Sequence, residues 1–453
     1  MIDDSTTVSL HTPAGPVTID LKEGATAYNA ALQGTERQPT AACRCREGYL
    51  GGKTSSVTDY WSYREGELVI SELETYIEDG WDVDRFTRFE NYGRDETAPE
   101  YRTVKIAFDS SAVVAIQSTR CLKNRLSGDK IVVRTSIDCD GDHRVRVFFN
   151  SDDVTRAKAS AFITGLIDHY HAHGPQRGAV FDAHNNFIRR DSGASDKLVL
   201  APVTKALVDR HIFGAFRLRE RIASAGMETC KGVILSGPPG TGKTLLIKSI
   251  AEQTDMTVIV VSPDMIQPGT ISKVYKTARR YSPALVVLED IDSAGGLSRK
   301  IADHPVLGEV LQALSGISSN AGVYTVASSN HIERLDAAIL DRPGRFSRII
   351  NIDVHDADTR RKLLERLALD YEVSDVDLDW LTDNTHGFSG DWTTELFETA
   401  LKFAWLDERD EATTEDFEEA LDDIDLNRSQ VYSPTKELPV PSCMARSPEG
   451  SYA

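Results

Sequence analysis

Residues 237–244 read Gly237-Pro238-Pro239-Gly240-Thr241-Gly242-Lys243-Thr244, and this stretch decides the fold. The residues before it, Lys-Gly-Val-Ile-Leu at 231–235, form an apolar run typical of a buried strand. The residues after it, Leu-Leu-Ile-Lys-Ser-Ile-Ala at 245–251, indicate a helix. A strand, a glycine-rich loop and a helix in this order are the context that this loop pattern needs.

The loop predicts a site for phosphate groups. Its glycines let backbone N–H groups converge on β- and γ-phosphates, and the helix N-terminus adds partial positive charge. Lys243 can reach the β/γ oxygens, and the Thr244 hydroxyl can bind Mg²⁺. We therefore expect the nucleotide to contact Gly237, Pro238, Pro239, Gly240, Thr241, Gly242, Lys243, Thr244 and Leu245.

A second motif is acidic and follows a strand. Residues 284–288, Ala-Leu-Val-Val-Leu, predict the strand, and Glu289, Asp290 and Asp292 come directly after it. In an open parallel sheet the carboxyl ends of the strands are where ligands bind. Carboxylates at that edge can hold the water shell of Mg²⁺ and polarise an attacking water.

With these two motifs and four further segments, the chain resembles the AAA family of ATPases, within AAA+, over about residues 198–428. Residues 323–330 resemble a strand ending in the family's sensor asparagine, Asn330. Residues 335–346 resemble its second region of homology, which contains Arg342 and Arg345. Residues 385–391, including Gly390, resemble the lid segment beside the adenine pocket, and residues 311–316 resemble a helix that usually ends in Asp-Gly.

The resemblance implies ATP and Mg²⁺ as cofactors and assigns roles to single residues. Asn330 would orient the attacking water or the γ-phosphate. Arg342 and Arg345 would be arginine fingers that meet the γ-phosphate of a neighbouring subunit's ATP. Because such an arginine acts between subunits, the resemblance implies a homo-oligomer, usually a hexameric ring.

The chain departs from the family in its acidic pair. The usual order is Asp-Glu, whereas this chain has Glu289 on the metal side and Asp290 in the catalytic position. The Asp290 side chain is shorter by one methylene, ~1.5 Å, and a misplacement of ~1 Å can cost ~100-fold in rate. The same order resembles the Bcs1-like branch of the family. We expect hydrolysis, with a rate that the shorter carboxylate could lower.

A second departure lies after the strand at 258–261. The family usually places an aromatic-hydrophobic-glycine pore loop there, but residues 262–270, Ser-Pro-Asp-Met-Ile-Gln-Pro-Gly-Thr, contain no aromatic and lead almost directly into a helix at 271–280. Met265 and Ile266 would give a weak apolar contact in a pore, or belong to the core. An aromatic grip on an extended polypeptide is therefore not expected.

The pattern along the chain predicts an α/β P-loop NTPase domain with a C-terminal helical lid, preceded by an α+β N-terminal domain. Residues 1–190 alternate like half-buried strands, with a helix at 157–173. Client or partner recognition is the role open to this domain, but it contains no recognised motif and is left unassigned. A polar stretch at 189–196 indicates a linker. We expect the ATPase large domain at 191–355, the lid at 356–428 and a disordered tail at 429–453.

Composition restricts the class of protein. The 453 residues carry a net charge of −19, which on average repels nucleic-acid phosphates. No apolar run approaches the ~18 residues that cross a bilayer, and the acidic start does not indicate a signal peptide. The 6 scattered cysteines suit a reducing compartment. We expect a cytoplasmic protein with no membrane segment.

Three weaker patterns favour structural roles. His169 and His173 share a helix face at a spacing that a metal could use, but the zinc-protease glutamate is missing. Cys43 and Cys45 are too close for a zinc knuckle. Asp-Gly within residues 138–142 is better explained as a hairpin turn than as a calcium loop.

Three functions agree with these observations. The first is an ATP-driven ring that remodels or disassembles protein complexes, with an unidentified protein client. The second is a slow ATP-gated switch or assembly scaffold, which the Glu-Asp order and the short loop favour. The third is a DNA-handling ATPase, which the acidic charge disfavours.

Overall fold

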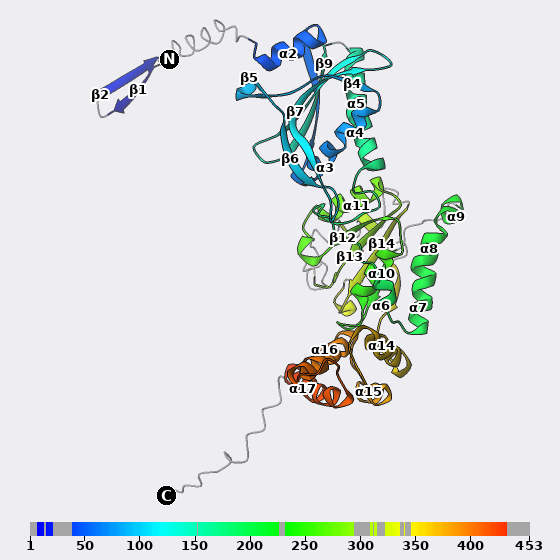
Figure 1. Cartoon of the computed structure of the whole chain (residues 1–453). Helices are drawn as coiled ribbons and strands as arrows, with labels where there is room; N and C mark the ends of the chain where they lie inside the picture. Colours follow the sequence, from blue (N-terminus) through cyan, green and yellow to red (C-terminus); the bar gives the residue numbers. More distant parts are fainter. Residues whose placement is uncertain are drawn as a thin grey trace, which may run out of the picture. The chain divides into compact units, whose positions relative to one another are not determined.

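The computed structural model describes residues 7–12, 15–20, 39–151, 153–225, 232–293, 309–310, 312–314, 322–335, 339 and 346–432. By its contacts the chain divides into two compact units (Figure 1). The first lies within residues 1–104 and 112–169, and the second within residues 105–111 and 170–453.

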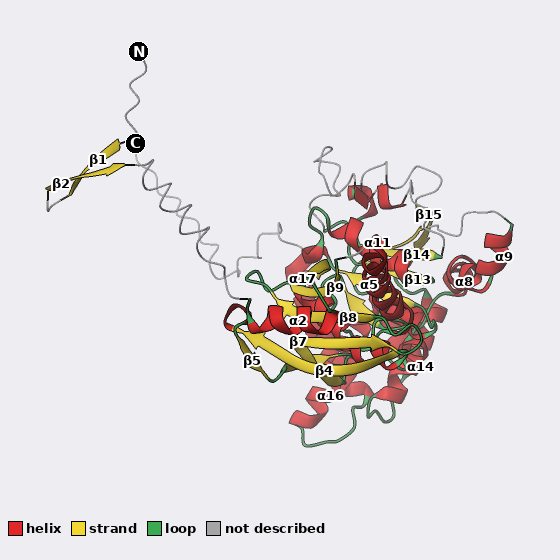
Figure 2. Cartoon of the chain, turned by 90° about the horizontal axis from the view of Figure 1, so that it is seen from above, coloured by secondary structure: helices red, strands yellow, loops and turns green. Residues whose placement is uncertain are grey.

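The first unit contains an antiparallel sheet with the strand order β3-β9-β8-β7-β4-β5, and β6 also pairs with β7 (Figure 2). In β9 buried and partly exposed residues alternate from His143 to Val147, as the sequence predicts. The Asp138 carboxylate accepts hydrogen bonds from the backbone N–H of Asp140 and Asp142 at 3.0 and 2.9 Å, which closes the expected hairpin. The strands are β3 (Thr54–Trp61), β4 (Trp81–Glu90), β5 (Asp95–Thr97), β6 (Glu100–Lys105), β7 (Ser111–Asn124), β8 (Lys130–Ile137) and β9 (His143–Asn150). A separate antiparallel pair is formed by β1 (Thr7–Thr12) and β2 (Gly15–Asp20).

Helices pack on this sheet. Leu50 of α2 shares an apolar cluster with Cys121, Val132 and Phe148 of three strands. Phe162 of α5 packs edge-to-face on Tyr76 and on Trp81. The helical segments are α2 (Ala41–Leu50), α3 (Tyr63–Ser71), α4 (Leu73–Glu78), η1 (Asn91–Gly93) and α5 (Asp153–His173), whose last residues belong to the second unit.

The second unit is built on a parallel sheet with the strand order β10-β12-β13-β14-β11-β15. Its strands are short and apolar because helices cover parallel sheets. In β13 every residue is buried. The strands are β10 (Val180–Asp182), β11 (Gly232–Ser236), β12 (Thr257–Val261), β13 (Ala284–Leu288), β14 (Val323–Ser329) and β15 (Phe346–Asn351).

The domain boundary expected at residue 190 is wrong in position. Residues 170–190 belong to the second unit, where β10 pairs in parallel with β12. The stretch at 189–196 is also not a free linker. The Arg190 guanidinium donates to the carbonyls of Gly178 and Thr254 at 2.7 and 2.6 Å, and Glu252 accepts from the N–H of Gly193. These tertiary hydrogen bonds fix a segment whose polar composition resembles a loop.

Helices of the large subdomain surround the sheet. The buried Val208, Ile212 and Phe216 share one core cluster with residues of the strands. The segments are α6 (Ala194–Lys197), α7 (Pro202–Val208), η2 (Asp209–Phe213), α8 (Gly214–Arg217), α9 (Arg219–Ser224), α10 (Lys243–Glu252), η3 (Pro263–Met265), α11 (Thr270–Arg280) and η4 (Ile332–Arg334).

A helical subdomain follows, with its own apolar cluster that includes Leu364, Phe397 and Phe417. It consists of α14 (Ala357–Asp370), α15 (Leu378–Asn384), α16 (Gly390–Leu406) and α17 (Thr414–Tyr432). Asp356 caps α14 by accepting from the N–H of Thr359 at 2.8 Å. The last helix extends to Tyr432, beyond the start of the tail expected at 429, and residues 433–453 lie outside the described residues.

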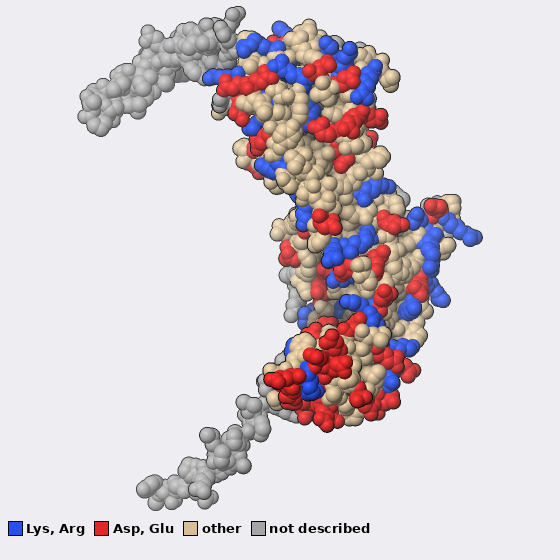
Figure 3. All heavy atoms as spheres, in the orientation of Figure 1, with Lys and Arg blue, Asp and Glu red and all other residues tan. Residues whose placement is uncertain are grey.

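Acidic side chains gather over the surface of this helical subdomain (Figure 3). Within the described part of the chain, no helix has both the length and the apolar character needed to span a membrane.

Candidate functional site

The glycine-rich loop joins β11 to α10 at the carboxyl edge of the parallel sheet. A Cβ atom on Gly237 would lie 2.0 Å from the carbonyl oxygen of Ile352, so only glycine fits there. Lys243, the first residue of α10, turns back and donates from Nζ to the carbonyls of Gly237 and Pro238 at 2.7 Å each. The lysine ammonium group thus lies inside the curve of the loop, hydrogen-bonded to the loop backbone.

The loop also contacts the helical subdomain. The backbone N–H of Asp391, in the first turn of α16, donates to the Gly240 carbonyl at 3.1 Å. A Cβ on Gly390 would lie 3.1 Å from the same carbonyl oxygen, and one on Gly240 would lie 2.7 Å from Ser389 Oγ. Gly240 also has φ +78°. Small residues on both sides therefore let the helix N-terminus approach the loop.

The acidic motif follows β13, and Asn330 follows the neighbouring strand β14. Asn330 donates from Nδ2 to Oδ1 of Asp290 at 3.2 Å, and its backbone N–H donates to Asp292 at 2.9 Å. The Ser328 hydroxyl accepts from the backbone N–H of Asp290 at 2.9 Å. The structure therefore brings together the predicted carboxylate and the predicted asparagine.

Asp290 has φ +41°, in the left-handed region. Among residues other than glycine, Asp and Asn are several-fold enriched there, because a short polar side chain can form local hydrogen bonds. Backbone strain of this kind clusters at functional sites. The short carboxylate is thus matched to an unusual backbone at the position where the family has Glu.

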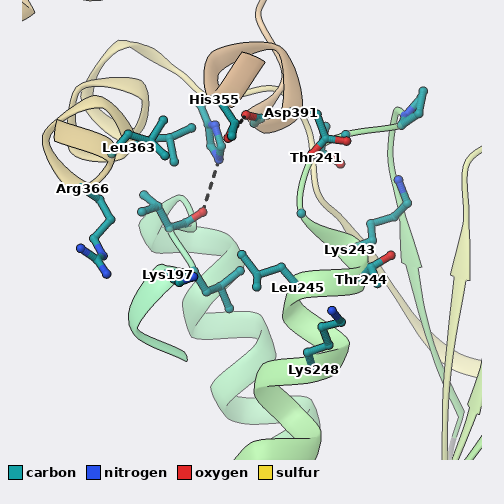
Figure 4. Close-up of a pocket in the computed structure, with 18 of the residues that line it drawn as sticks. Lys197, Thr241, Lys243, Thr244, Leu245, Lys248, His355, Leu363, Arg366 and Asp391 are labelled. Carbon is teal, nitrogen blue, oxygen red and sulfur yellow. Dashed lines mark hydrogen bonds between the residues drawn. The ribbon is translucent and has the colours of Figure 1, made fainter. Parts of the chain in front are cut away.

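These parts line one cavity of about 860 Å³ between the large and helical subdomains of the second unit. Lys243 and Thr244 lie at one end, and Leu363, Arg366 and Lys197 lie at the other (Figure 4). The lining residues come from the loop, both strand ends, the helices α6, α10, α14 and α16, and segments next to α6 and α14: Lys197, Leu198, Val199, Pro239, Gly240, Thr241, Gly242, Lys243, Thr244, Leu245, Lys248, Asp290, Asn330, His355, Leu363, Arg366, Leu367, Asp370, Tyr371, Gly390, Asp391 and Thr394.

The end away from Lys243 has apolar walls, with Arg366 and Lys197 as charged groups beside them. Leu198, Val199, Leu363 and Leu367 line it. His355 Nε2 lies 3.3 Å from the Val199 carbonyl oxygen (Figure 4, dashed line). An apolar slot with a few fixed polar groups suits a flat heterocycle, and the phosphate loop then takes the charged end of the same ligand.

Charge at the phosphate end is arranged around Lys243. Burial lowers the pKa of its ammonium group, and the carboxylates of Asp290, Asp292 and Asp391 oppose that effect. Burial and the neighbouring Asp290 raise the pKa of Glu289, while Lys248 lowers it. The buried Oδ1 of Asn330 has no hydrogen-bond partner within the described residues. The hydroxyl of Thr244 and the carboxylates are hard oxygen ligands that suit Mg²⁺ with its waters.

Most predicted site residues meet in this cavity, with five exceptions. Gly237 and Pro238 do not line it, but their carbonyls accept hydrogen bonds from Lys243. Glu289 follows β13 but does not line the cavity. Arg342 and Arg345 lie outside the described residues, as do residues 231, 311, 315–316 and 336–338 of the segments that carry the resemblance.

Sequence reasoning missed His355 and Asp391 as cavity residues. His355 follows the last strand of a parallel sheet and precedes the capped start of α14, a position at which ligand contacts are common. Asp391 lies next to the predicted Gly390. Position relative to a strand or helix end was the available signal for both.

The segment between β12 and α11 is as short as expected. It contains the 3₁₀ turn η3, and Met265 and Ile266 are both partly exposed. The backbone N–H of Gly269 donates to Glu309 Oε1 at 2.6 Å. Neither apolar side chain is part of the buried core.

Comparisons with known proteins agree with this site. Residues 233–354 match the family described as ATPase family associated with various cellular activities (AAA). Proteasome-activating nucleotidase 2 of Halobacterium salinarum is 34% identical over 219 residues, which cover 45% of this chain and 53% of that protein. A proteasome-activating nucleotidase of Methanothermobacter thermautotrophicus is 36% identical over 222 residues, with the same two shares.

A more distant relative is an ATP-dependent zinc metalloprotease FtsH of Mesoplasma florum. It is 29% identical over 218 residues, 45% of this chain and 33% of that protein. The chain thus spans about half the length, or less, of these curated relatives. It contains an AAA ATPase domain, and it is homologous to proteasome-activating nucleotidases and FtsH over that domain.

Proposed function

We propose that this protein hydrolyses ATP, with Mg²⁺, as a ring of identical subunits, and that it uses the energy to remodel or disassemble protein complexes. The observation that carries the proposal is the cavity that joins the phosphate loop, Asp290, Asn330 and the N-terminus of α16. The similarity to proteasome-activating nucleotidases supports the ring and the protein client.

In this proposal the adenine lies in the apolar end between Val199 and α14, and the phosphates lie on the loop. Lys243 exchanges the carbonyls of Gly237 and Pro238 for phosphate oxygens. Thr244, with Glu289 through water, would hold Mg²⁺, which neutralises charge on the phosphates. Glu289 does not line the cavity, unlike Thr244, so Thr244 is the stronger member of this pair.

Asp290 acts as the general base in this scheme. It accepts the proton of the attacking water, and Asn330 fixes the carboxylate through its 3.2 Å hydrogen bond. Arg342 and Arg345 of one subunit would stabilise the γ-phosphate charge in the site of the next. The contact between Gly240 and the start of α16 lets the helical subdomain act as a lid that reports the state of the loop.

Measuring ATPase rate against protein concentration tests the ring mechanism. We expect the rate per subunit of the wild type to rise with concentration, and Arg345→Ala to lower it by about 10³-fold, the lower bound for an arginine finger. Arg334→Ala is a matched control, because Arg334 is an exposed arginine in the same region. If the rate of Arg345→Ala equals that of the wild type and neither depends on concentration, the ring mechanism is wrong.

A slow ATP-gated switch or scaffold is the second candidate. The Glu289-Asp290 order and the short segment after β12 favour it, because they weaken the arguments for fast hydrolysis and for an aromatic grip. Two further expectations from the sequence also remain predictions: a cytoplasmic location, and a relationship to the Bcs1-like branch through the Glu289-Asp290 order. Brisk turnover, together with unfolding of a tagged, folded test protein, would exclude the switch.

Capture of partners on Asp290→Asn with ATP identifies the client. The trapped ATP state should retain its partner, and Asp290→Asn with Lys243→Ala should not. Binding to single- or double-stranded DNA that weakens with salt would instead favour the DNA-handling alternative.

A further inference from the structure

The first unit carries a group of arginines on one face of its sheet. Arg134 of β8 and Arg146 of β9 are direct cross-strand partners, so their side chains share a face. Val132 and Phe148 lie on the same face, two residues away along each strand, and they pack against α2. Arg46 of α2 extends over this face, with Cζ 4.3 Å from the centre of the Phe148 ring. Arg146 Cζ lies 5.9 Å from the same ring.

No carboxylate among the described residues balances the positive charges of this group. None of Arg46, Arg134 and Arg146 forms an ion pair with a described residue. Arg146 donates from Nε to the Thr58 hydroxyl at 3.0 Å, and Arg46 donates to Cys43 Sγ at 3.2 Å. Like charges directly opposite each other destabilise a sheet. Burial lowers the pKa of Arg134, and the charges of Arg46, Arg146 and Arg88 lower it further.

Nearby arginines are compensated, which sets this group apart. Arg88 forms ion pairs with Glu90 and Glu100 at 3.2 and 2.8 Å. Arg144, two residues before Arg146, forms one with Asp138 at 2.9 Å. The neighbouring arginines therefore have carboxylate partners, whereas Arg46, Arg134 and Arg146 have none among the described residues.

Buried donors without partners lie at the same place. Thr119 pairs directly with Arg134 in the sheet, is 2% exposed, and its hydroxyl has no hydrogen-bond partner within the described residues. The buried Nε of Arg46 also has none. Buried polar groups are rarely left unsatisfied in folded proteins. Two orphaned donors beside unbalanced guanidinium groups indicate that a ligand belongs there.

We propose that Arg46, Arg134, Arg146 and Thr119 form a binding site for a phosphate-type oxyanion in the first unit. Guanidinium forks match phosphate oxygens and bind them in pairs. A doubly charged, tetrahedral anion balances more of the three charges than a carboxylate does and accepts more hydrogen bonds. The site is separate from ATP hydrolysis and does not depend on it. The bound phosphate can be free phosphate or the phosphoryl group of a phosphoserine on a protein.

Calorimetric titration of the full chain tests this site. Because the phosphate loop also binds phosphate, every protein carries Lys243→Ala. We expect orthophosphate to bind at one site per chain, at constant ionic strength. Arg134→Gln should weaken binding at least tenfold, and Arg94→Gln, an exposed arginine of the same unit, should leave it unchanged. Equal binding by both variants, or no binding by the parent, would overturn the proposal.

A phosphoserine peptide and its serine counterpart distinguish the two sources. Tighter binding of the phosphopeptide than of orthophosphate assigns the site to a modified protein, and equal binding assigns it to free phosphate. Thermal unfolding separates a ligand role from a structural one. Without phosphate, Arg134→Met should raise the melting temperature of the protein, because the substitution removes repulsion between the arginines. Added phosphate should then no longer raise the melting temperature of this variant. If the substitution lowers the melting temperature and phosphate still stabilises the variant, Arg134 is structural and the site is disproved.

Discussion

The amide of Asn330 donates to the carboxylate of Asp290 across 3.2 Å. These residues are 40 positions apart in the chain and meet because β13 and β14 are neighbours in a parallel sheet. Asp290 has a left-handed backbone, and its N–H is bound by Ser328, so the carboxylate has few other positions. The catalytic-position residue of the reversed acidic pair is thus held in a fixed local geometry.

Substitution of Asp290 tests whether the site is fitted to aspartate. Asp290→Asn should lower kcat by about 100-fold or more, because it removes the base. Asp290→Glu restores the length that the family uses, yet we expect it to lower kcat by roughly 10- to 100-fold, because a longer chain on this backbone misplaces the carboxylate. Steady-state kinetics and ATP binding check both. A faster enzyme with Asp290→Glu would refute the fit.

The substitution Asn330→Ala, which removes the side-chain amide, should lower kcat by about 100-fold or more and leave the Kd of ATP nearly unchanged. Because Asn330 acts on the water together with Asp290, the double variant with Asp290→Asn should be little worse than Asp290→Asn alone. Asn351→Ala, at the exposed end of β15, is the control. Additive losses in the double variant would show that the two residues act independently.

Gly390→Ala should weaken ATP binding by about fivefold, or ~1 kcal/mol. The added Cβ would lie 3.1 Å from the Gly240 carbonyl oxygen and push α16 away from the loop. Equilibrium binding of a fluorescent ATP analogue measures the effect. Gly48→Ala, whose Cβ would have no atom within 4 Å, should have none. Unchanged affinity for Gly390→Ala would mean that the contact with the loop is irrelevant to binding.

His143 should make the first unit sensitive to acid. Its side chain is 0% exposed, both ring nitrogens lack hydrogen-bond partners within the described structure, and burial lowers its pKa below the usual 6.5. The unfolded chain then binds the proton more readily, so stability is full above pH 6.5 and falls as the pH drops below it.

Urea unfolding at pH 7.5 and 5.5 measures this dependence. From pH 7.5 to pH 5.5 the urea midpoint of His143→Leu should fall less than that of the wild type. The midpoint of His386→Leu, in which an exposed histidine is replaced, should fall as much as that of the wild type. If all three proteins weaken equally in acid, His143 does not contribute.

The sequence placed the elements around the candidate site better than it placed the domain boundary. The order strand, glycine-rich loop, helix and the acid after an apolar strand are local patterns, and β11, α10 and β13 appear where those patterns place them. The segment at 170–190 could not be assigned in this way. Its one short strand, β10, depends on pairing with β12 more than 70 residues later, and such pairing leaves no local mark.

The sequence by itself determined which residues make up the candidate site. Lys243, Thr244, Asp290 and Asn330 are recognisable because phosphate and water chemistry needs those residue types after those elements. Only the tertiary structure decided how they are used. It set the left-handed backbone of Asp290, placed Gly390 against Gly240 and added His355 to the cavity. It also gathered on one sheet face three arginines that form no ion pair within the described part of the chain. The physical reason is that spacing along a chain reports local backbone geometry, whereas contacts between distant strands and helices depend on sheet order and packing.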